Sequence, residues 1–396
     1  MHVRLATTLV SSLALLLSSG LAAGAPAASP VVVRALQPFL DQEEIAGVVT
    51  LVAREGEIVH LDAQGLSDAA ARRLLRTDDL FWIASMTKPI AAVAVLMLQD
   101  EGRLSVDDAV ARHLPEFDDA WQVAERTDDR LVLKRPLRRI TLRDLLTHTA
   151  GVANVDEPRP HTTLGELVAQ ISQCPLGFDP GSRWSYSNAG IDTLGRVVEV
   201  VSGQSFAEFL DERLFHPLGM HDTTFFPSRS QSRRVAKSYE KKEGQLAETQ
   251  VSFLKGDLGD RSRTVRPAGG LYSTAEDMFR FYRMLLDGGV CDGHRYLSEA
   301  AVHQMTRTQT GELETGFSPG MSWGLGFQVV KEPQGVTAML APGTFGHGGA
   351  YATQSWADPQ TRMIYILMVQ RRGFPNGDQS PIRQAFQAAA ALAFAR

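Results

Sequence analysis

Hydrophobic residues form short strand-like runs near both ends of the chain, whereas the middle has the three-to-four-residue spacing of amphipathic helices. Gly56 separates the first two apolar runs in the way expected of a hairpin. Strands are predicted at residues 45–53, 57–64, 324–330, 351–356 and 363–370. We therefore expect both ends of the chain to contribute strands.

Helices are predicted where the apolar spacing coincides with a Gly, Pro, Ser or Thr at a boundary. The strongest pattern covers residues 89–100 and stops at Gly102. The other predicted helices are residues 31–41, 142–147, 164–172, 191–201, 206–214, 275–286 and 382–394. Residues 118–134 are charged and polar, and they predict a surface loop.

The simplest assembly of these elements is an α+β fold with one antiparallel sheet flanked by helices, plus an all-helical lobe. Residues 31–84 and 300–396 would form the α/β lobe, and residues 85–299 would form the mainly helical lobe. A length of 396 residues suits two substructures, because single cores stop growing at about 250–300 residues. The cleft between the lobes is the expected place for a site.

Composition narrows the function. The chain has 40 Lys and Arg against 45 Asp and Glu, a formal charge of −5, so nothing favours a nucleic-acid partner. The ten histidines lack spacings such as H-E-x-x-H, and we expect no metal and no organic cofactor. Cys174 and Cys291 could form a disulfide or remain two buried thiols.

Residues 1–25 have the features of a secretory signal peptide. One arginine, Arg4, precedes an uncharged apolar run that ends in small residues. The alternative is a membrane anchor, but the run contains several serines and is barely long enough to span a bilayer. We expect an exported protein, periplasmic or secreted, without stable membrane insertion.

Ser85-Met86-Thr87-Lys88 stands at the start of the strongest predicted helix. A serine and a lysine three residues apart share one helix face, where a desolvated amine could activate the hydroxyl. The alternative is a helix cap followed by a solvated lysine. The same spacing occurs at Ser238 and at Ser252, but both lie in polar stretches that predict solvated loops.

Two later segments could complete a site. In Tyr186-Ser187-Asn188 a phenol could move a proton and an amide could hold a carbonyl, although taken alone the segment is better explained by a buried tyrosine bonded to the backbone. In His347-Gly348-Gly349-Ala350 the glycines would let a ligand approach the backbone, and the alternative is a glycine-rich turn.

A further serine, Ser318, lies in the pattern G-x-S-x-G but lacks the strand-turn-helix context and a downstream histidine, so we interpret it as loop. His148, Trp184, Tyr272, Trp323 and Trp356 are expected to be structural or to line the cleft.

Taken together, the three motifs resemble those of the serine β-lactamase and penicillin-recognising family. The chain is most similar to the branch that holds class C β-lactamases, D-alanyl-D-alanine carboxypeptidases, D-aminopeptidases and family VIII carboxylesterases. Segments 145–151, 178–181, 217–220 and 269–274 support the resemblance, which spans residues 33–371.

The resemblance implies a role for each motif residue. Ser85 would attack an acyl carbonyl, and Lys88 and Tyr186 would share the proton transfers. Asn188 would position the substrate or Lys88, while the third motif would line the substrate site. The backbone N–H groups of Ser85 and Ala350 would hold the oxyanion.

The third motif departs from the Lys-Thr-Gly of β-lactamases, whose lysine helps to bind a carboxylate. Here His347 takes that place, which favours uncharged esters. The first hypothesis is therefore an exported carboxylesterase-like serine hydrolase acting on a small-molecule ester, amide or peptide. The second is a D-alanyl-D-alanine carboxypeptidase, D-aminopeptidase or β-lactamase. The third is a non-catalytic relative that binds cell-wall peptides.

Overall fold

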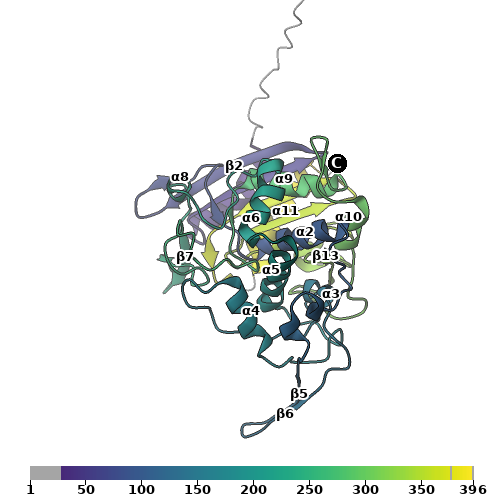
Figure 1. Cartoon of the computed structure of the whole chain (residues 1–396). Helices are drawn as coiled ribbons and strands as arrows, with labels where there is room; N and C mark the ends of the chain where they lie inside the picture. Colours follow the sequence, from purple (N-terminus) through teal and green to yellow (C-terminus); the bar gives the residue numbers. More distant parts are fainter. Residues whose placement is uncertain (1–27, 375–376, 395–396) are drawn as a thin grey trace, which may run out of the picture.

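The computed structural model describes residues 28–374 and 377–394, so the predicted signal peptide at residues 1–25 lies outside the described part. Eight strands form one sheet in the order β12-β13-β14-β15-β16-β1-β2-β3, and every neighbouring pair is antiparallel (Figure 1). The strands are β1 (Gly47–Arg54), β2 (Glu57–Asp68), β3 (Arg73–Leu74), β12 (Met321–Trp323), β13 (Gln328–Val330), β14 (Phe345–Gly348), β15 (Gln354–Asp358) and β16 (Met363–Met368). Both ends of the chain thus supply strands, and the predicted α+β class is confirmed.

Helices cover both faces of the sheet. Val48 and Val52 of β1 point to the face covered by α1 (Pro30–Asp41) and α11 (Pro381–Phe394). Val49 and Leu51 point to the other face, which packs against α2 (Thr87–Asp100) and α9 (Ala275–Leu286). Because both faces are buried, β1 is apolar throughout rather than alternating. α9 lies on the sheet, although its residues belong to the range predicted for the helical lobe.

The helical part is arranged around α5 (Asn188–Ser202), which contacts α2 and three shorter helices. Ser187 caps its start by accepting from the Gly190 N–H at 3.0 Å, and Gly203, with φ +79°, ends it. The remaining helices are α3 (Leu142–Leu146), α4 (Leu164–Ser172), α6 (Phe206–Leu210), α7 (His216–Leu218), α8 (Arg229–Ser232) and α10 (Glu299–Met305).

Short strand pairs complete the fold. One of them, β4 (Phe81–Trp82) with β9 (Tyr272–Ser273), leads directly into Ser85. Two more pairs are β5 (Gln122–Arg126) with β6 (Leu131–Lys134) and β10 (Val290–Cys291) with β11 (His294–Arg295). A three-stranded sheet has the order β17 (Arg371–Arg372), β7 (Ser238–Lys242), β8 (Gln245–Thr249). The β5–β6 hairpin projects beyond α3 and α4 (Figure 1).

Most predicted elements are found within a few residues of their expected bounds, but three predictions are wrong in detail. Residues 118–134 contain the β5–β6 hairpin rather than only a loop. Residues 324–330 do not form one strand, because a turn at Gly326 separates β12 from β13. Ser238 begins β7 and is buried, not part of a solvated loop. Of the two alternatives left open for the cysteines, the disulfide is absent: both are free, with Cys291 buried and Cys174 partly exposed.

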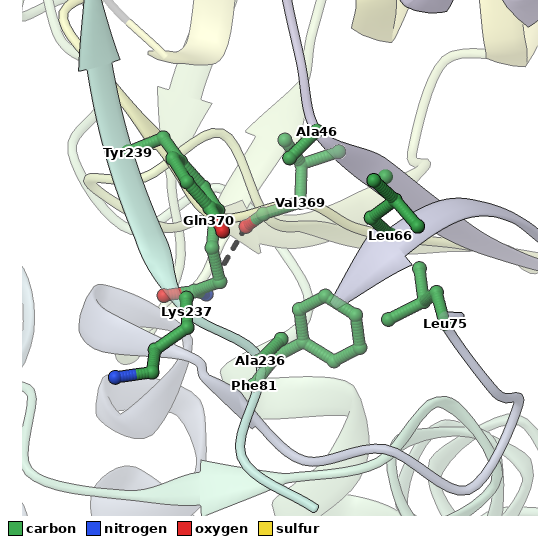
Figure 2. Close-up of a pocket in the computed structure, with 10 residues that line it drawn as sticks. Ala46, Leu66, Leu75, Phe81, Ala236, Lys237, Tyr239, Val369 and Gln370 are labelled. Atoms are coloured by element: carbon green, nitrogen blue, oxygen red, sulfur yellow. Dashed lines mark hydrogen bonds between the residues drawn. The ribbon is translucent and has the colours of Figure 1, made fainter. Parts of the chain in front are cut away.

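The Gln370 side chain fixes the backbone at Trp82, three residues before Ser85. Its Nε2 donates to the Trp82 carbonyl at 2.9 Å. The same nitrogen donates to the Val369 carbonyl at 3.1 Å (Figure 2). The cavity drawn there lies between Ala46, Leu66, Phe81 and Gln370 and measures about 10 Å³. It has room for about one water molecule and is not a substrate pocket.

Candidate active site

Ser85 lies in a 3₁₀ turn (Ala84–Met86) that runs directly into α2. Its neighbours Ala84 and Met86 are buried, whereas Ser85 itself is partly exposed. Ala84 has φ +47°, a strained conformation for an L-residue that is typical of functional sites. Neither helical start has a side-chain cap, which disfavours the interpretation of Ser85 as a helix cap.

Lys88 is one turn further along and is wholly buried. Its Nζ donates to Ser85 Oγ at 3.1 Å and to the Ala268 carbonyl at 2.6 Å. Burial lowers the pKa of Lys88 to about 7, helped by the positive charge of Arg266 and opposed by Asp192 and Asp378. The alternative of a solvated lysine is wrong, and a large share of this amine is neutral near pH 7.

A buried ion pair behind Lys88 fixes its position. The Ala268 N–H donates to Asp192 Oδ1 at 2.9 Å, and Arg266 Nε donates to Asp192 Oδ2 at 3.0 Å. A second nitrogen of Arg266, Nη1, reaches Glu157 at 2.6 Å. We did not predict these residues from the sequence, although a carboxylate in the apolar run of α5 was a signal that could have found Asp192.

Tyr186 brings the second motif to the same place. Its ring centroid lies 4.7 Å from Lys88 Nζ, and its hydroxyl is near enough to Ser85 for the serine to lower its pKa. Desolvation raises the pKa of Tyr186 above its usual value, and the neighbouring Ser85 only partly opposes this. The phenol therefore stays protonated at neutral pH and can donate.

His148 holds the Tyr186 loop, in agreement with the structural role expected for it. Its carbonyl accepts from the Ser185 N–H at 2.9 Å, and its Nδ1 accepts from the Ser187 N–H at 3.2 Å. The rings of His148 and Tyr186 are 4.6 Å apart between centroids. Burial lowers the pKa of His148, so the imidazole is neutral and can accept at Nδ1.

Asn188 is the first residue of α5 and is partly exposed. Its backbone N–H donates to Asn154 Oδ1 at 2.8 Å. Its predicted role toward the substrate or Lys88 stays a prediction.

The third motif forms the end of β14 and lies against the turn that carries Ser85. A Cβ on Gly349 would be 2.7 Å from the Ile83 carbonyl, two residues before the serine. The Gly349 N–H already donates to the Thr353 carbonyl at 2.7 Å, so the oxyanion donors expected here remain those of Ser85 and Ala350. The three motifs are thus brought together.

The two glycines of this motif are explained by the packing of the protein itself. A Cβ on Gly348 would collide with Asp378 Oδ1, and one on Gly349 would collide with Thr353 Oγ1. The expectation that the glycines make room for a ligand is therefore unnecessary.

His347 is buried in this motif and is uncharged. Its Nδ1 donates to the Gly348 carbonyl at 2.7 Å, which leaves Nε2 as an acceptor. Burial lowers the pKa of His347 to about 4, with a further contribution from the charge of Lys88. The position that holds a lysine in β-lactamases therefore carries no positive charge at neutral pH.

Aromatic rings form the wall next to Tyr186. The Phe317 ring lies 5.0 Å from the Tyr186 ring, and Trp184 lies 5.7 Å from Phe317 and 5.2 Å from Trp323. Trp184 and Phe317 are partly exposed and can contact a bound molecule, whereas Trp323 is buried behind them. This aromatic surface beside Tyr186 suits contact with an apolar group.

Rival chemistries find no support in the described part of the chain. Ser318 is buried in a loop, as predicted. Within residues 28–374 and 377–394 no three His, Cys, Asp or Glu side chains are grouped to hold a metal ion.

Over the same residues, no helix is long and apolar enough to cross a membrane.

Comparisons with known proteins bear on the family and the fold. The family model described as Beta-lactamase matches residues 32–390. Protein Rv1367c of Mycobacterium tuberculosis is 34% identical over 85% of this chain and 88% of its own length. Esterase EstB of Burkholderia gladioli is 30% identical over 88% of this chain and 91% of its own length. The structure of EstCE1, a hydrolase with promiscuous acyltransferase activity, has a TM-score of 0.76 at 24% identity, covers 91% of this chain and 97% of its own, and supports the fold.

Proposed function

We propose, from the premise that this chain belongs to the β-lactamase family of serine hydrolases, that it is a carboxylesterase working through an acyl-enzyme on Ser85. The observation that carries the proposal is the contact of Ser85 Oγ with a buried amine whose pKa is lowered to about 7. An amine that is largely neutral can take the serine proton as the hydroxyl attacks.

The proposed mechanism assigns each step to a residue of the site. Lys88 takes the Ser85 proton, and Ser85 Oγ forms a bond to the acyl carbon. The N–H groups of Ser85 and Ala350 hold the oxyanion. Tyr186, which the environment keeps protonated, donates its proton to the departing alcohol and recovers one from Lys88. Water then attacks the acyl-enzyme by the same steps in reverse.

An uncharged third motif favours esters over β-lactams. His347 is neutral and buried, so it offers no cation to the carboxylate that β-lactams carry. The likeness to Esterase EstB supports the same choice. Hydrolysis of D-amino-acid peptides or β-lactams is the second candidate, which uses the same residues.

Export is part of the proposal and rests on the sequence of residues 1–25. Fusing these residues to alkaline phosphatase, which is active only after export, tests it. Activity of the fusion supports export, and an inactive fusion with retained precursor contradicts it.

Fluorophosphonate labelling followed by peptide mapping tests the acyl-enzyme. We expect the label on Ser85, its loss in Ser85→Ala, and unchanged thermal stability in that variant. A screen of p-nitrophenyl esters, nitrocefin and a D-Ala-D-Ala peptide then separates the two candidates, with short esters turned over fastest. Absence of a label on Ser85 would leave a binding protein as the better explanation.

A further inference from the structure

We propose that the protein has a second binding site, a pocket lined by Tyr272, Leu254 and Lys255, that takes an aliphatic carboxylate of medium length such as octanoate. This Tyr272 pocket measures about 520 Å³ and is lined by residues of the β7–β8 hairpin, the loop at residues 250–258 and β9. Its volume is in the range of small-molecule sites. The proposal goes beyond the acyl-enzyme function and does not depend on it.

A buried phenol supplies a free hydrogen-bond donor to the Tyr272 pocket. Tyr272 is 3% exposed, yet its hydroxyl oxygen is accessible and forms no hydrogen bond with any described residue. Buried tyrosine hydroxyls usually have a partner. Burial raises the pKa of Tyr272 to about 12, so the phenol stays protonated and can donate to an acceptor in the pocket.

The walls of the Tyr272 pocket suit an aliphatic chain. Leu254 is buried, and three further aliphatic side chains of the wall are partly buried: Val235, Val251 and Leu258. All four pack in one cluster with Tyr272, so the apolar surface is continuous. An aliphatic chain that covers this surface removes it from water, which favours binding.

The charged side chains that line the pocket favour an anion. Lys237 pairs with Glu248 at 2.9 Å, so these two charges offset each other. Lys255 is exposed at the pocket and has no ion pair among the residues that the structure describes. The lining therefore carries one uncompensated positive charge.

Arg263 adds a buried positive charge behind the pocket wall. It is 6% exposed and forms no ion pair in the described part of the chain. Its Nη2 donates to the carbonyl of Leu258, a wall residue, at 3.3 Å. Asp257 and Asp260 oppose its charge from beyond ion-pair distance, and its field reaches Tyr272. A carboxylate at the Tyr272 hydroxyl would thus offset a charge that the protein leaves unpaired.

The Tyr272 pocket is separate from the catalytic serine. Ser85 does not line it, although Ala84, the residue before the serine, belongs to the same buried cluster as Tyr272. A carboxylate should therefore bind whether or not Ser85 is blocked.

Isothermal titration calorimetry with two ligands of the same chain length, octanoate and octyltrimethylammonium, tests the chemistry of the site. We expect octanoate to bind more tightly than the cation by about tenfold or more, because the cation can neither accept from the phenol nor offset the positive charges. Hexanoate should bind about tenfold more weakly than octanoate, because it buries two methylene groups fewer. Equal affinities of octanoate and the cation, or no binding of octanoate at millimolar concentration, would overturn the proposal.

Tyr272→Phe removes the hydroxyl and keeps the ring. We expect it to weaken octanoate binding about tenfold, through loss of a hydrogen bond to a charged group, and to leave the melting temperature unchanged. Lys255→Gln should weaken binding about threefold, as expected for an exposed charge. Lys242→Gln is the matched control, because Lys242 lies on the same hairpin, pairs with Glu240 and does not line the pocket, so its Kd should equal that of the wild type. A Tyr272→Phe variant that binds octanoate as tightly as the wild type would contradict the proposal.

Blocking Ser85 with a fluorophosphonate shows where octanoate binds. We expect the labelled and unlabelled proteins to have the same Kd for octanoate. Loss of binding on labelling would place octanoate at Ser85 and overturn the second site. A protein that takes no label on Ser85 contradicts the acyl-enzyme function alone, since the titrations of the Tyr272 pocket do not need that reaction.

Discussion

A single side chain, Lys88, shows how burial creates the chemistry. A lysine in water is almost wholly protonated at neutral pH and cannot accept a proton. Here the apolar helix α2 removes water from the amine, and the Ala268 carbonyl and Ser85 Oγ give it two oxygen partners. Asp192 and Arg266 place opposite charges behind it, so the pKa depends on the balance between them.

Arg266→Gln should therefore move the acid limb of the kcat/KM profile. In the wild type we expect activity to rise with pH through about 7, because the base must lose its proton. Removing Arg266 takes away a charge that lowers the pKa of Lys88 and leaves Asp192, which raises it. We expect the limb to move to higher pH by on the order of one unit, measured on an uncharged ester.

Arg196→Gln is the control for this shift. Arg196 lies one turn beyond Asp192 on α5 but pairs with Glu199 and has no part in the site. The acid limb of the kcat/KM profile of this variant should coincide with that of the wild type. A limb that stays in place in Arg266→Gln would show that the ion pair does not set the pKa of Lys88.

Individual site residues could be predicted from the sequence where they belong to a contiguous motif. Ser85 and Lys88 share one helical turn, and Tyr186 and His347 each lie in a short motif that can be recognised from the residues next to them. Asp192, Arg266 and Asp378 could not be found in this way. Their effect depends on tertiary contacts with a carbonyl, a glycine or a neighbouring charge, and no local pattern records those.

Secondary-structure elements show the same division. The helices at residues 164–172 and 275–286 were predicted at their observed bounds, because an amphipathic period and a capping Thr mark them. The strand expected at residues 324–330 is instead a turn followed by the short strand β13, with β12 ending just before it at Trp323. A Cβ on Gly326 would be 2.5 Å from the Ala92 Cβ, so the approach of α2 requires the turn, and α2 is far away in the sequence.

Two helical glycines test how closely elements must approach. A Cβ on Gly195 of α5 would collide with the Pro267 ring, in the segment whose Ala268 carbonyl holds Lys88. We expect Gly195→Ala to lower the free energy of unfolding by about 1–3 kcal/mol, as overpacking does. We also expect it to reduce kcat, because Lys88 loses its alignment. Urea unfolding and ester turnover measure the two effects.

Gly165→Ala in α4 is the comparison. Its added Cβ would be 3.4 Å from the flexible side chain of Arg196, so the helix can gain up to about 1 kcal/mol from the better helix former. Equal effects of the two substitutions would show that segment 266–268 does not need the close approach at Gly195.

The interior of the protein contains histidines and a carboxyl group whose pKa values are shifted toward the uncharged form. Burial lowers the pKa of His60, His148 and His347, while it raises the pKa of Asp277 to about 6. The histidines and the carboxyl group act in opposite directions on stability as the pH falls. The fold class could be predicted from the sequence, because the pattern at both ends of the chain predicts strands. The burial of these side chains could not be predicted, because it depends on which helix covers which face of the sheet.

His347→Asn should make the protein less sensitive to acid. Between pH 6.5 and about 4 the unfolded chain binds a proton at residue 347 that the folded protein refuses, so the free energy of unfolding falls as the pH falls. We expect the loss between pH 7.5 and 5.0, measured by urea unfolding, to be smaller by about 2 kcal/mol in the variant. Asp277→Asn should act oppositely, because the folded carboxyl group gains its proton first, near pH 6, and its removal should enlarge the loss by about 1 kcal/mol. Shifts of the same sign in both variants would contradict the assignment of a neutral buried imidazole to residue 347.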